Sequence, residues 1–277
     1  MRVCLVLPMS RQGGDVAIIL WARRRDFMFC DSHAHLDDEQ YEEDRKELIA
    51  MLQNNGISLV INIGADIKSS RASVALAESY DFIYASVGLH PYEAVKMTDE
   101  DLTQLELLAM NKKVVAIGEI GLDYHCDVDR EAQKACFRRQ AELAKRLNLP
   151  IIVHDREAHK DCVDIVKEVG GRGVFHCYSG SPEMARELID LGFYISFAGP
   201  LTYKNSKNAV MTAEFMPEDK VLVETDCPYL SPEGHRGKRN NPVFVRNVAQ
   251  KLADIREITL EEAAKITMDN TRRLFGI

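Results

Sequence analysis

The chain has 277 residues, of which 46% are hydrophobic and 28% are charged, and its formal net charge is −8. This composition is typical of a globular protein with a sizeable core, and the length allows one large α/β domain or two small ones. The negative charge argues against nonspecific nucleic-acid binding through a broad basic surface, although bound metal ions can supply positive charge locally. No apolar stretch reaches the ~20 residues needed to span a membrane, so no membrane association is expected.

The first 27 residues differ in charge from the rest of the chain. Five arginines and two aspartates give residues 1–27 a charge of +3, whereas the remaining residues carry −11. The apolar run DVAIILWA precedes the arginines, which is the reverse of a secretory signal. We therefore expect residues 1–27 to be an N-terminal extension, either disordered or lying upstream of a natural start at Met28. The functional domain is expected to span residues 28–277.

The seven cysteines are odd in number, and no two of them have C-x-x-C spacing. Free thiols in a reducing cytoplasm are the simplest interpretation. The sequence therefore favours a cytoplasmic protein without a disulfide framework.

Short apolar runs alternate with amphipathic stretches from residue 28 onward. The runs are rich in Val and Ile, as expected of strands buried on both faces; they cover 28–32, 58–63, 83–88, 114–118, 150–153, 173–175, 193–197 and 221–223. Helices are predicted over 39–55, 69–80, 99–110, 130–147, 157–169, 205–215, 242–253 and 259–274, with a further helix opening at Ser181-Pro182.

Eight predicted strands alternating with eight or nine helices indicate a single-domain (β/α)₈ TIM barrel. A doubly wound open sheet is the competing fold. The first strand is not followed by G-x-G-x-x-G, which weakens the dinucleotide-binding form of that alternative.

Ionisable residues stand at the ends of most predicted strands, where a barrel carries its catalytic residues. They are His33 and His35 (first strand), His90 (third), Glu119 and Asp123 (fourth), His154 and Asp155 (fifth), His176 (sixth), and Glu224 and Asp226 (eighth). Five of the eight histidines occupy such ends, and random placement would scatter them. This clustering predicts a shared site at one rim of the barrel.

Imidazole and carboxylate groups at this rim suit divalent metal ions. Alternate residues of a strand point to the same side, so His33 and His35 can bind one ion that Asp226 faces. The histidines of the fifth and sixth strands can hold a second ion, and Glu119 has two oxygens with which to bridge the pair. Each residue taken alone could instead have a purely structural role, as a polar strand end or an ion-pair partner. Together they predict a centre of two divalent ions, Mg, Mn or Zn.

Six sequence motifs also carry a family resemblance: DSHAHLDD, SVGLHP, AIGEIGLDYH, PIIVHDREAH, VFHCYSGS and LVETDCPYLSP. In this order they resemble the TatD family of metal-dependent hydrolases, from about Phe29 to the C-terminus, whereas the first 27 residues have no counterpart. The resemblance implies an amidohydrolase-like TIM barrel whose metal ligands are His33, His35, Glu119, His154, His176 and Asp226. It also implies hydrolysis of DNA phosphodiester bonds, often as a 3′→5′ exonuclease.

This ligand set suggests a mechanism in which Asp226 takes a proton from the attacking water and Glu119 bridges the ions. The basic segment 232–239 follows the eighth strand, where His235 and Arg236 could grip a phosphate, although a solvated loop is an equal alternative. His90 and Tyr203 are the other candidate substrate-binding residues, the tyrosine as a ring on which a base could stack.

The expected partner is a DNA strand end or another phosphodiester, and no protein partner is evident. The same centre could instead hydrolyse a small phosphate ester, a lactone or an amide. A non-catalytic binding protein on an inherited barrel is the alternative outside enzymology, and the intact ligand set argues against it.

Overall fold

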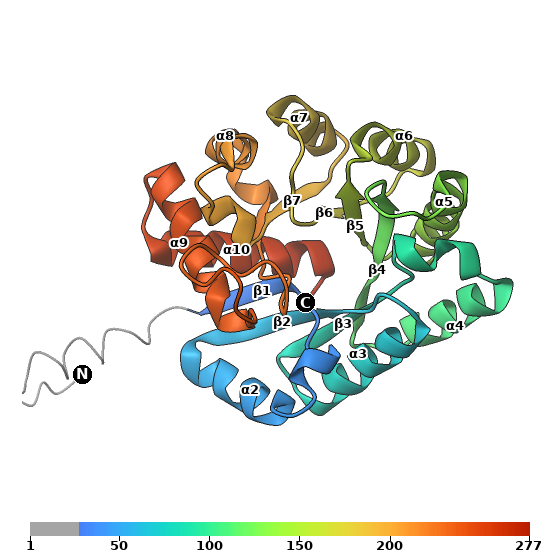
Figure 1. Cartoon of the computed structure of the whole chain (residues 1–277), viewed down its shortest axis with the longest axis horizontal. Helices are drawn as coiled ribbons and strands as arrows, with labels where there is room; N and C mark the ends of the chain where they lie inside the picture. The colour runs from blue at the N-terminus through green and yellow to red at the C-terminus, as the bar shows by residue number, and fades with distance from the viewer. Residues whose placement is uncertain (1–27) are drawn as a thin grey trace, which may run out of the picture.

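The computed structural model of the chain describes residues 28–277 (Figure 1). The predictions made for residues 1–27, an extension and a start at Met28, lie outside the described residues. Within the described part, no helix combines the length and the apolar composition that crossing a membrane would require. The six cysteines found there are all free thiols.

Eight parallel strands form one sheet in which each strand pairs with the next along the chain. They are β1 (Phe29–Ala34), β2 (Ile57–Ile63), β3 (Ile83–Val87), β4 (Val114–Asp123), β5 (Ile151–Arg156), β6 (Gly173–Phe175), β7 (Tyr194–Phe197) and β8 (Val221–Val223). Figure 1 shows the helices arranged around the outside of this ring of strands. The predicted (β/α)₈ barrel is confirmed, and the open-sheet alternative is excluded.

The ring closes between β8 and β1 at the carboxyl ends of the strands. A single parallel bridge joins Ala34 to Cys227 there. The amide of His35 donates to the carbonyl of Cys227 over 2.8 Å, and the amide of Asp226 donates to the carbonyl of His33 over 2.9 Å. The barrel is therefore joined at the rim where the predicted site residues stand.

The main helices follow the strands in the expected alternation. They are α2 (Arg45–Leu52), α3 (Ile67–Ser79), α4 (Asp99–Ala109), α5 (Arg130–Leu147), α6 (His159–Val169), α7 (Pro182–Asp190), α8 (Lys207–Phe215), α9 (Val245–Arg256) and α10 (Leu260–Phe275). Short 3₁₀ helices lie between them: η2 (Glu39–Tyr41), η3 (Gln53–Asn55), η4 (Pro91–Lys96), η5 (Gly199–Thr202), η6 (Glu218–Lys220) and η7 (Pro242–Phe244).

Two kinds of predicted boundary were wrong. The single helix predicted over 39–55 is divided into η2, α2 and η3, and it ends where Gly56 adopts a φ of 83°. The strands β1, β4 and β5 continue to Ala34, Asp123 and Arg156, beyond their apolar runs. They continue because the backbone ladder pairs residues whatever their polarity; Leu122, for example, pairs with Asp155.

The core has two parts. The larger cluster lies between the strands and the surrounding helices, and Phe137 of α5 is one of its fully buried members. The smaller one includes the alternate residues Leu59, Ile61 and Ile63 of β2, which indicates that it fills the barrel interior. Because both faces of the strands are buried, the sheet is a rigid support for the side chains at its carboxyl ends.

Candidate metal centre

The carboxyl ends of five strands bring six of the predicted residues into one cluster. The contributing elements are β1, β4 and β5 and the residues directly after β1, β6 and β8; the side chains are His33, His35, Glu119, His154, His176 and Asp226. Glu119 is 4% exposed and His33 is completely buried, so the cluster lies inside the mouth of the barrel rather than on its surface.

The first group of atoms in this cluster consists of two histidine nitrogens and two carboxylate oxygens. His33 Nε2 lies 3.2 Å from His35 Nε2, 3.4 Å from Glu119 Oε2 and 3.5 Å from Asp226 Oδ1. His35 Nε2 lies 3.7 Å from the same Glu119 oxygen and 3.5 Å from the same Asp226 oxygen. A tetrahedral ion with ligand distances near 2.1 Å has ligand–ligand spacings of about 3.4 Å. His33 Nε2, His35 Nε2 and Asp226 Oδ1 are thus spaced as the ligands of one ion would be, and Glu119 Oε2 lies next to both nitrogens.

The second group surrounds the other oxygen of Glu119. Glu119 Oε1 lies 2.7 Å from His154 Nδ1 and 2.8 Å from His176 Nε2. The two histidine nitrogens are 3.3 Å apart. His90 Nε2 is 3.7 Å from the same oxygen, so His90 lies within the centre rather than at its rim. The carboxylate of Glu119 therefore faces a separate nitrogen group with each of its two oxygens.

Three of these histidines have their other ring nitrogen next to a hydrogen-bond acceptor. His35 Nδ1 is 3.2 Å from the carbonyl of Ile63, His154 Nε2 is 3.1 Å from Asp123 Oδ2, and His176 Nδ1 is 3.2 Å from Glu224 Oε1. A neutral imidazole has one N–H and one lone pair, so an N–H donated to these acceptors leaves the lone pair directed at the centre. This is the arrangement in which histidines bind metal ions.

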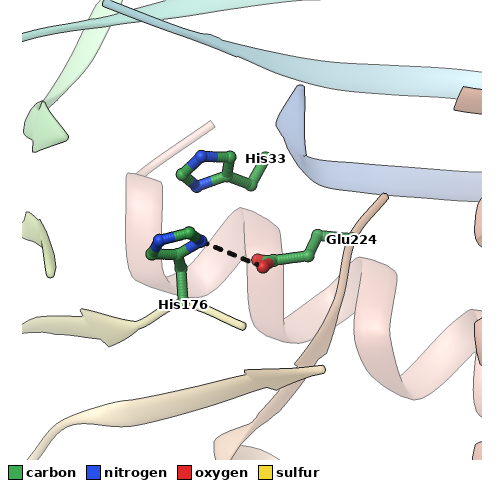
Figure 2. Close-up of side chains that lie close together, drawn as sticks. All are labelled: His33, His176 and Glu224. Atoms are coloured by element: carbon green, nitrogen blue, oxygen red, sulfur yellow. Dashed lines mark hydrogen bonds and ion pairs between the residues drawn. The ribbon is translucent and has the colours of Figure 1, made fainter. Parts of the chain in front are cut away.

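Glu224 lies beside His33 and His176, which come from different groups, and its carboxylate points toward His176 (Figure 2). His33 and His176 stack with their ring centroids 4.0 Å apart and an interplanar angle of 12°. The side chain of Glu224 also accepts the backbone N–H of Cys177 over 2.7 Å. His33 Nδ1 is buried and, among residues 28–277, has no hydrogen-bond partner. These three residues are close enough for a cation to lie among them as well.

Glu224 and Asp123 had no predicted role, although both were recognised as strand-end residues. They stand beside the predicted ligands, and that position is the signal that could have identified them. Their orientation toward His176 and His154 depends on packing between strands that are distant in sequence.

Ionisation equilibria in the cluster reflect burial opposed by close opposite charges. Burial lowers the pKa of His33. Burial also acts to lower the pKa of His35, but its hydrogen bond to Asp226 and the charges of Asp226 and Glu119 raise it to about 9. Burial would raise the pKa of Glu119, but His176 and His154 hold it well below its usual range. Without bound cations His35 therefore retains a proton at neutral pH, whereas His33 does not.

The turn that carries Asp226 is tied to β1 by the buried carboxylate of Asp31. Asp31 Oδ1 accepts the backbone N–H groups of Thr225 over 2.9 Å and of His33 over 3.3 Å, and its other oxygen accepts the hydroxyl of Thr225. Burial raises the pKa of Asp31 to about 8 against these hydrogen bonds. Asp226 itself adopts a φ of 55°, in the left-handed region that is uncommon for non-glycine residues. Asp31 thus fixes the position of Asp226 where β8 and β1 lack a continuous ladder.

The predicted substrate-binding residues Tyr203, His235 and Arg236 contact one another or neighbouring residues of the protein. The Arg236 guanidinium lies over the Tyr203 ring, 4.4 Å from its centroid, and the Tyr203 hydroxyl donates to the carbonyl of Ser231 over 2.9 Å. The His235 ring stacks on Phe244 with centroids 4.2 Å apart. Aromatic contacts therefore connect segment 232–239 to Tyr203 and Phe244, and one of them covers the Tyr203 ring with the Arg236 guanidinium.

Comparison with known proteins identifies the family. Residues 30–276 match the family model described as TatD related DNase. The chain is 46% identical to the uncharacterized metal-dependent hydrolase YabD of Bacillus subtilis, over 90% of this chain and 100% of the relative. It is 37% identical to the uncharacterized metal-dependent hydrolase YcfH of Escherichia coli, over 89% of this chain and 95% of the relative. The crystal structure of YjjV, a TatD homolog from Escherichia coli, superimposes with a TM-score of 0.85 at 31% identity over 90% of this chain and 98% of the other. The chain therefore belongs to the TatD family of metal-dependent hydrolases.

Proposed function

We propose that this protein is a two-metal phosphodiesterase that removes nucleotides from the 3′ ends of DNA strands. The observation that carries the proposal is the carboxylate of Glu119, whose two oxygens face two separate groups of histidine nitrogens. The matched family model is described as a DNase, and the relatives YabD and YcfH are described as metal-dependent hydrolases, which supports this class of reaction.

The residues present fit two divalent cations. The cluster offers imidazole nitrogens and carboxylate oxygens at close spacing, and these are the donors that such ions require. His33, His35, Glu119 and Asp226 would hold one ion; Glu119, His154 and His176 would hold the other. Bound there, the ions would polarise a phosphoryl oxygen and make a water molecule more acidic.

Asp226 is the residue best suited to remove a proton from the attacking water. Burial acts to raise its pKa, but the hydrogen bond to His35 and the charge of His33 lower it, so that the carboxylate is ionised at neutral pH. Its side chain is 13% exposed, so a water molecule and a substrate can reach it. Glu119 holds the two histidine groups together, and its own oxygens are occupied by those contacts. Asp226 therefore acts as the general base in this proposal.

The decisive assay measures hydrolysis with EDTA and then with added Mg²⁺, Mn²⁺ or Zn²⁺. The substrates are single-stranded DNA with a free 3′ end, a small phosphodiester and a lactone. We expect EDTA to abolish release of nucleotides from the DNA and at least one metal to restore it. Metal-dependent turnover of the lactone or the small ester alone would contradict the nuclease assignment and leave the hydrolase class in place.

Metal binding should release protons, because the pKa of His35 is raised to about 9 in the ion-free protein and those of His154 and His176 are raised as well. A protonated imidazole cannot bind a cation, so the affinity for the metal should increase with pH, most clearly around pH 9 where His35 loses its proton. The same sign predicts that the ion-free protein loses stability as the pH rises through about 9, since its folded state binds the proton more tightly.

Titration calorimetry in two buffers of different ionisation enthalpy measures this release. The apparent binding enthalpy should differ between the buffers in proportion to the number of protons released. Equal enthalpies in both buffers at pH 7 would contradict the prediction.

Glu224 should contribute to metal affinity, and an apolar residue in its place should weaken metal binding. Glu224→Ala removes the acceptor for His176 Nδ1–H and for the amide of Cys177, so the metal affinity should fall about 10- to 100-fold. Glu224→Gln keeps an acceptor oxygen and should lose less. Calorimetric titration with Mn²⁺ checks both variants, and equal affinities for Glu224→Ala and the wild type would rule this role out.

A further inference from the structure

Two tyrosine rings beside the centre are only half buried. Tyr92, the second residue of η4, and Tyr229, which follows β8, are each 49% exposed. Two other tyrosines that follow strand ends are covered: Tyr178 is buried, and the Arg236 guanidinium lies over the ring of Tyr203. Tyr92 and Tyr229 thus keep aromatic surface that a ligand can cover.

Each of these rings contacts a histidine of the centre, and the two histidines belong to different groups. The Tyr229 ring makes an edge-to-face contact with His35, with centroids 6.1 Å apart, and His35 belongs to the first group. Tyr92 meets His90 edge-on at 4.4 Å, and the ring of His90 lies 4.5 Å from that of His154 in the second group. The two tyrosines therefore flank the centre, one beside each group.

Both rings are also fixed by polar neighbours. The hydroxyl of Tyr229 donates to Asp38 Oδ2 over 2.6 Å, and Asp38 in turn caps η2. Tyr92 lies beside Asp123, where burial and the charge of that carboxylate raise the pKa of the phenol. A ring held at its hydroxyl end binds a flat ligand with little loss of conformational entropy.

We infer that Tyr229 and Tyr92 stack on the bases of the two nucleosides that flank the scissile phosphate. The inference rests on the proposed function, which puts that phosphate over the centre between the two rings. Aromatic stacking accepts any base, because every base has a π face. A base inside a duplex already stacks on its neighbours, so the substrate is an unpaired strand of any sequence with a nucleoside on both sides of the cleaved bond.

Model strands with single missing bases test this inference. The substrates are an intact single strand and two versions that carry an abasic residue on one side or the other of the terminal phosphodiester, each made as DNA and as RNA. Both hydrolysis and binding, by fluorescence anisotropy, are measured. For the wild type, each abasic residue should reduce kcat/KM and affinity about five- to 150-fold, the range for loss of one stacked base.

Variants assign each ring to one side of the cleaved bond. On the intact strand, Tyr92→Ala and Tyr229→Ala should each lower kcat/KM and affinity by a similar factor. On the strand that lacks the base stacked on the substituted tyrosine, each variant should match the wild type. Tyr92→Phe and Tyr229→Phe keep the ring and should recover most of the loss. Leu107→Ala, at an exposed apolar residue of α4 that lies outside the centre, is the matched control and should behave as the wild type.

The outcomes separate the inference from the proposed function. Hydrolysis that is insensitive to abasic residues, or alanine variants that lose equally on intact and abasic strands, overturns the stacking role and leaves the nuclease intact. Absence of hydrolysis with base-dependent binding overturns the nuclease and supports stacking. Absence of both overturns both.

Discussion

Glu119→Gln should reduce phosphodiester hydrolysis by about 10³-fold or more. The substitution keeps the shape of the side chain, but a neutral amide cannot present an anionic oxygen to each of the two histidine groups. Two ions held there would contribute several kcal/mol to transition-state stabilisation, and each 1.36 kcal/mol corresponds to a factor of ten in rate. The bound metal should fall from two ions per chain to one or none.

Steady-state hydrolysis and elemental analysis of the purified variant check this prediction together. Glu233→Gln makes the same chemical change at an exposed residue of segment 232–239 and should retain both ions. Thermal unfolding shows whether the variant still folds. A Glu119→Gln protein with two ions and wild-type turnover would rule out the bridging role.

The sequence predicted that Glu119 lies in the shared site, because Glu119 follows one of the apolar runs that recur regularly along the chain. The barrel follows from this series: each strand is short and rich in β-branched residues, and each amphipathic helix covers it. Once strands are parallel and neighbours in order, their carboxyl ends must meet at one rim. This topology alone predicted that His33, His154 and Asp226 lie close together, although the sequence provides no distances.

Apolar patterning was a poor guide to where the strands end. β4 and β5 extend into polar residues because their ladder continues through pairs such as Gly121 with His154. Polar residues inside a strand resemble a loop in a one-dimensional pattern, and at this rim they include residues of the candidate metal centre. The site requires polar side chains at positions where a buried strand would normally have apolar ones. The errors in the predicted strand ends therefore fall at the candidate metal centre.

Orientation was the second property that the sequence could not provide. His90, predicted to bind substrate, lies 3.7 Å from Glu119, a distance that the sequence alone could not give, and Tyr92 beside it had no predicted role. The closing of the barrel is another example. Asp31 appears in the sequence as one polar residue within a strand, but it joins β1 to the Asp226 turn through two hydrogen bonds with Thr225. Such contacts link residues far apart in the chain and leave no local pattern.

Asp226→Asn should reduce hydrolysis by about 10³-fold, because the variant loses the carboxylate that we propose as the general base. Asp226 Oδ1 also stands 3.5 Å from both His33 Nε2 and His35 Nε2, so the first ion should bind more weakly. The two effects differ in their pH dependence. Without an internal base the reaction depends on hydroxide from solvent, and kcat of the variant should rise about tenfold per pH unit where that of the wild type is flat.

Measuring kcat at saturating metal between pH 6 and 9, with the ion content determined on the same samples, separates the two roles. Asp254→Asn on α9, an exposed carboxylate that accepts from Gln250, is the control for the loss of one negative charge. Two bound ions with a steep pH profile would assign proton transfer to Asp226, whereas a lost ion with a flat profile would assign it to ligation alone. Turnover at the wild-type rate with both ions bound would exclude Asp226 as the base, because its carboxylate would then contribute neither charge nor proton transfer.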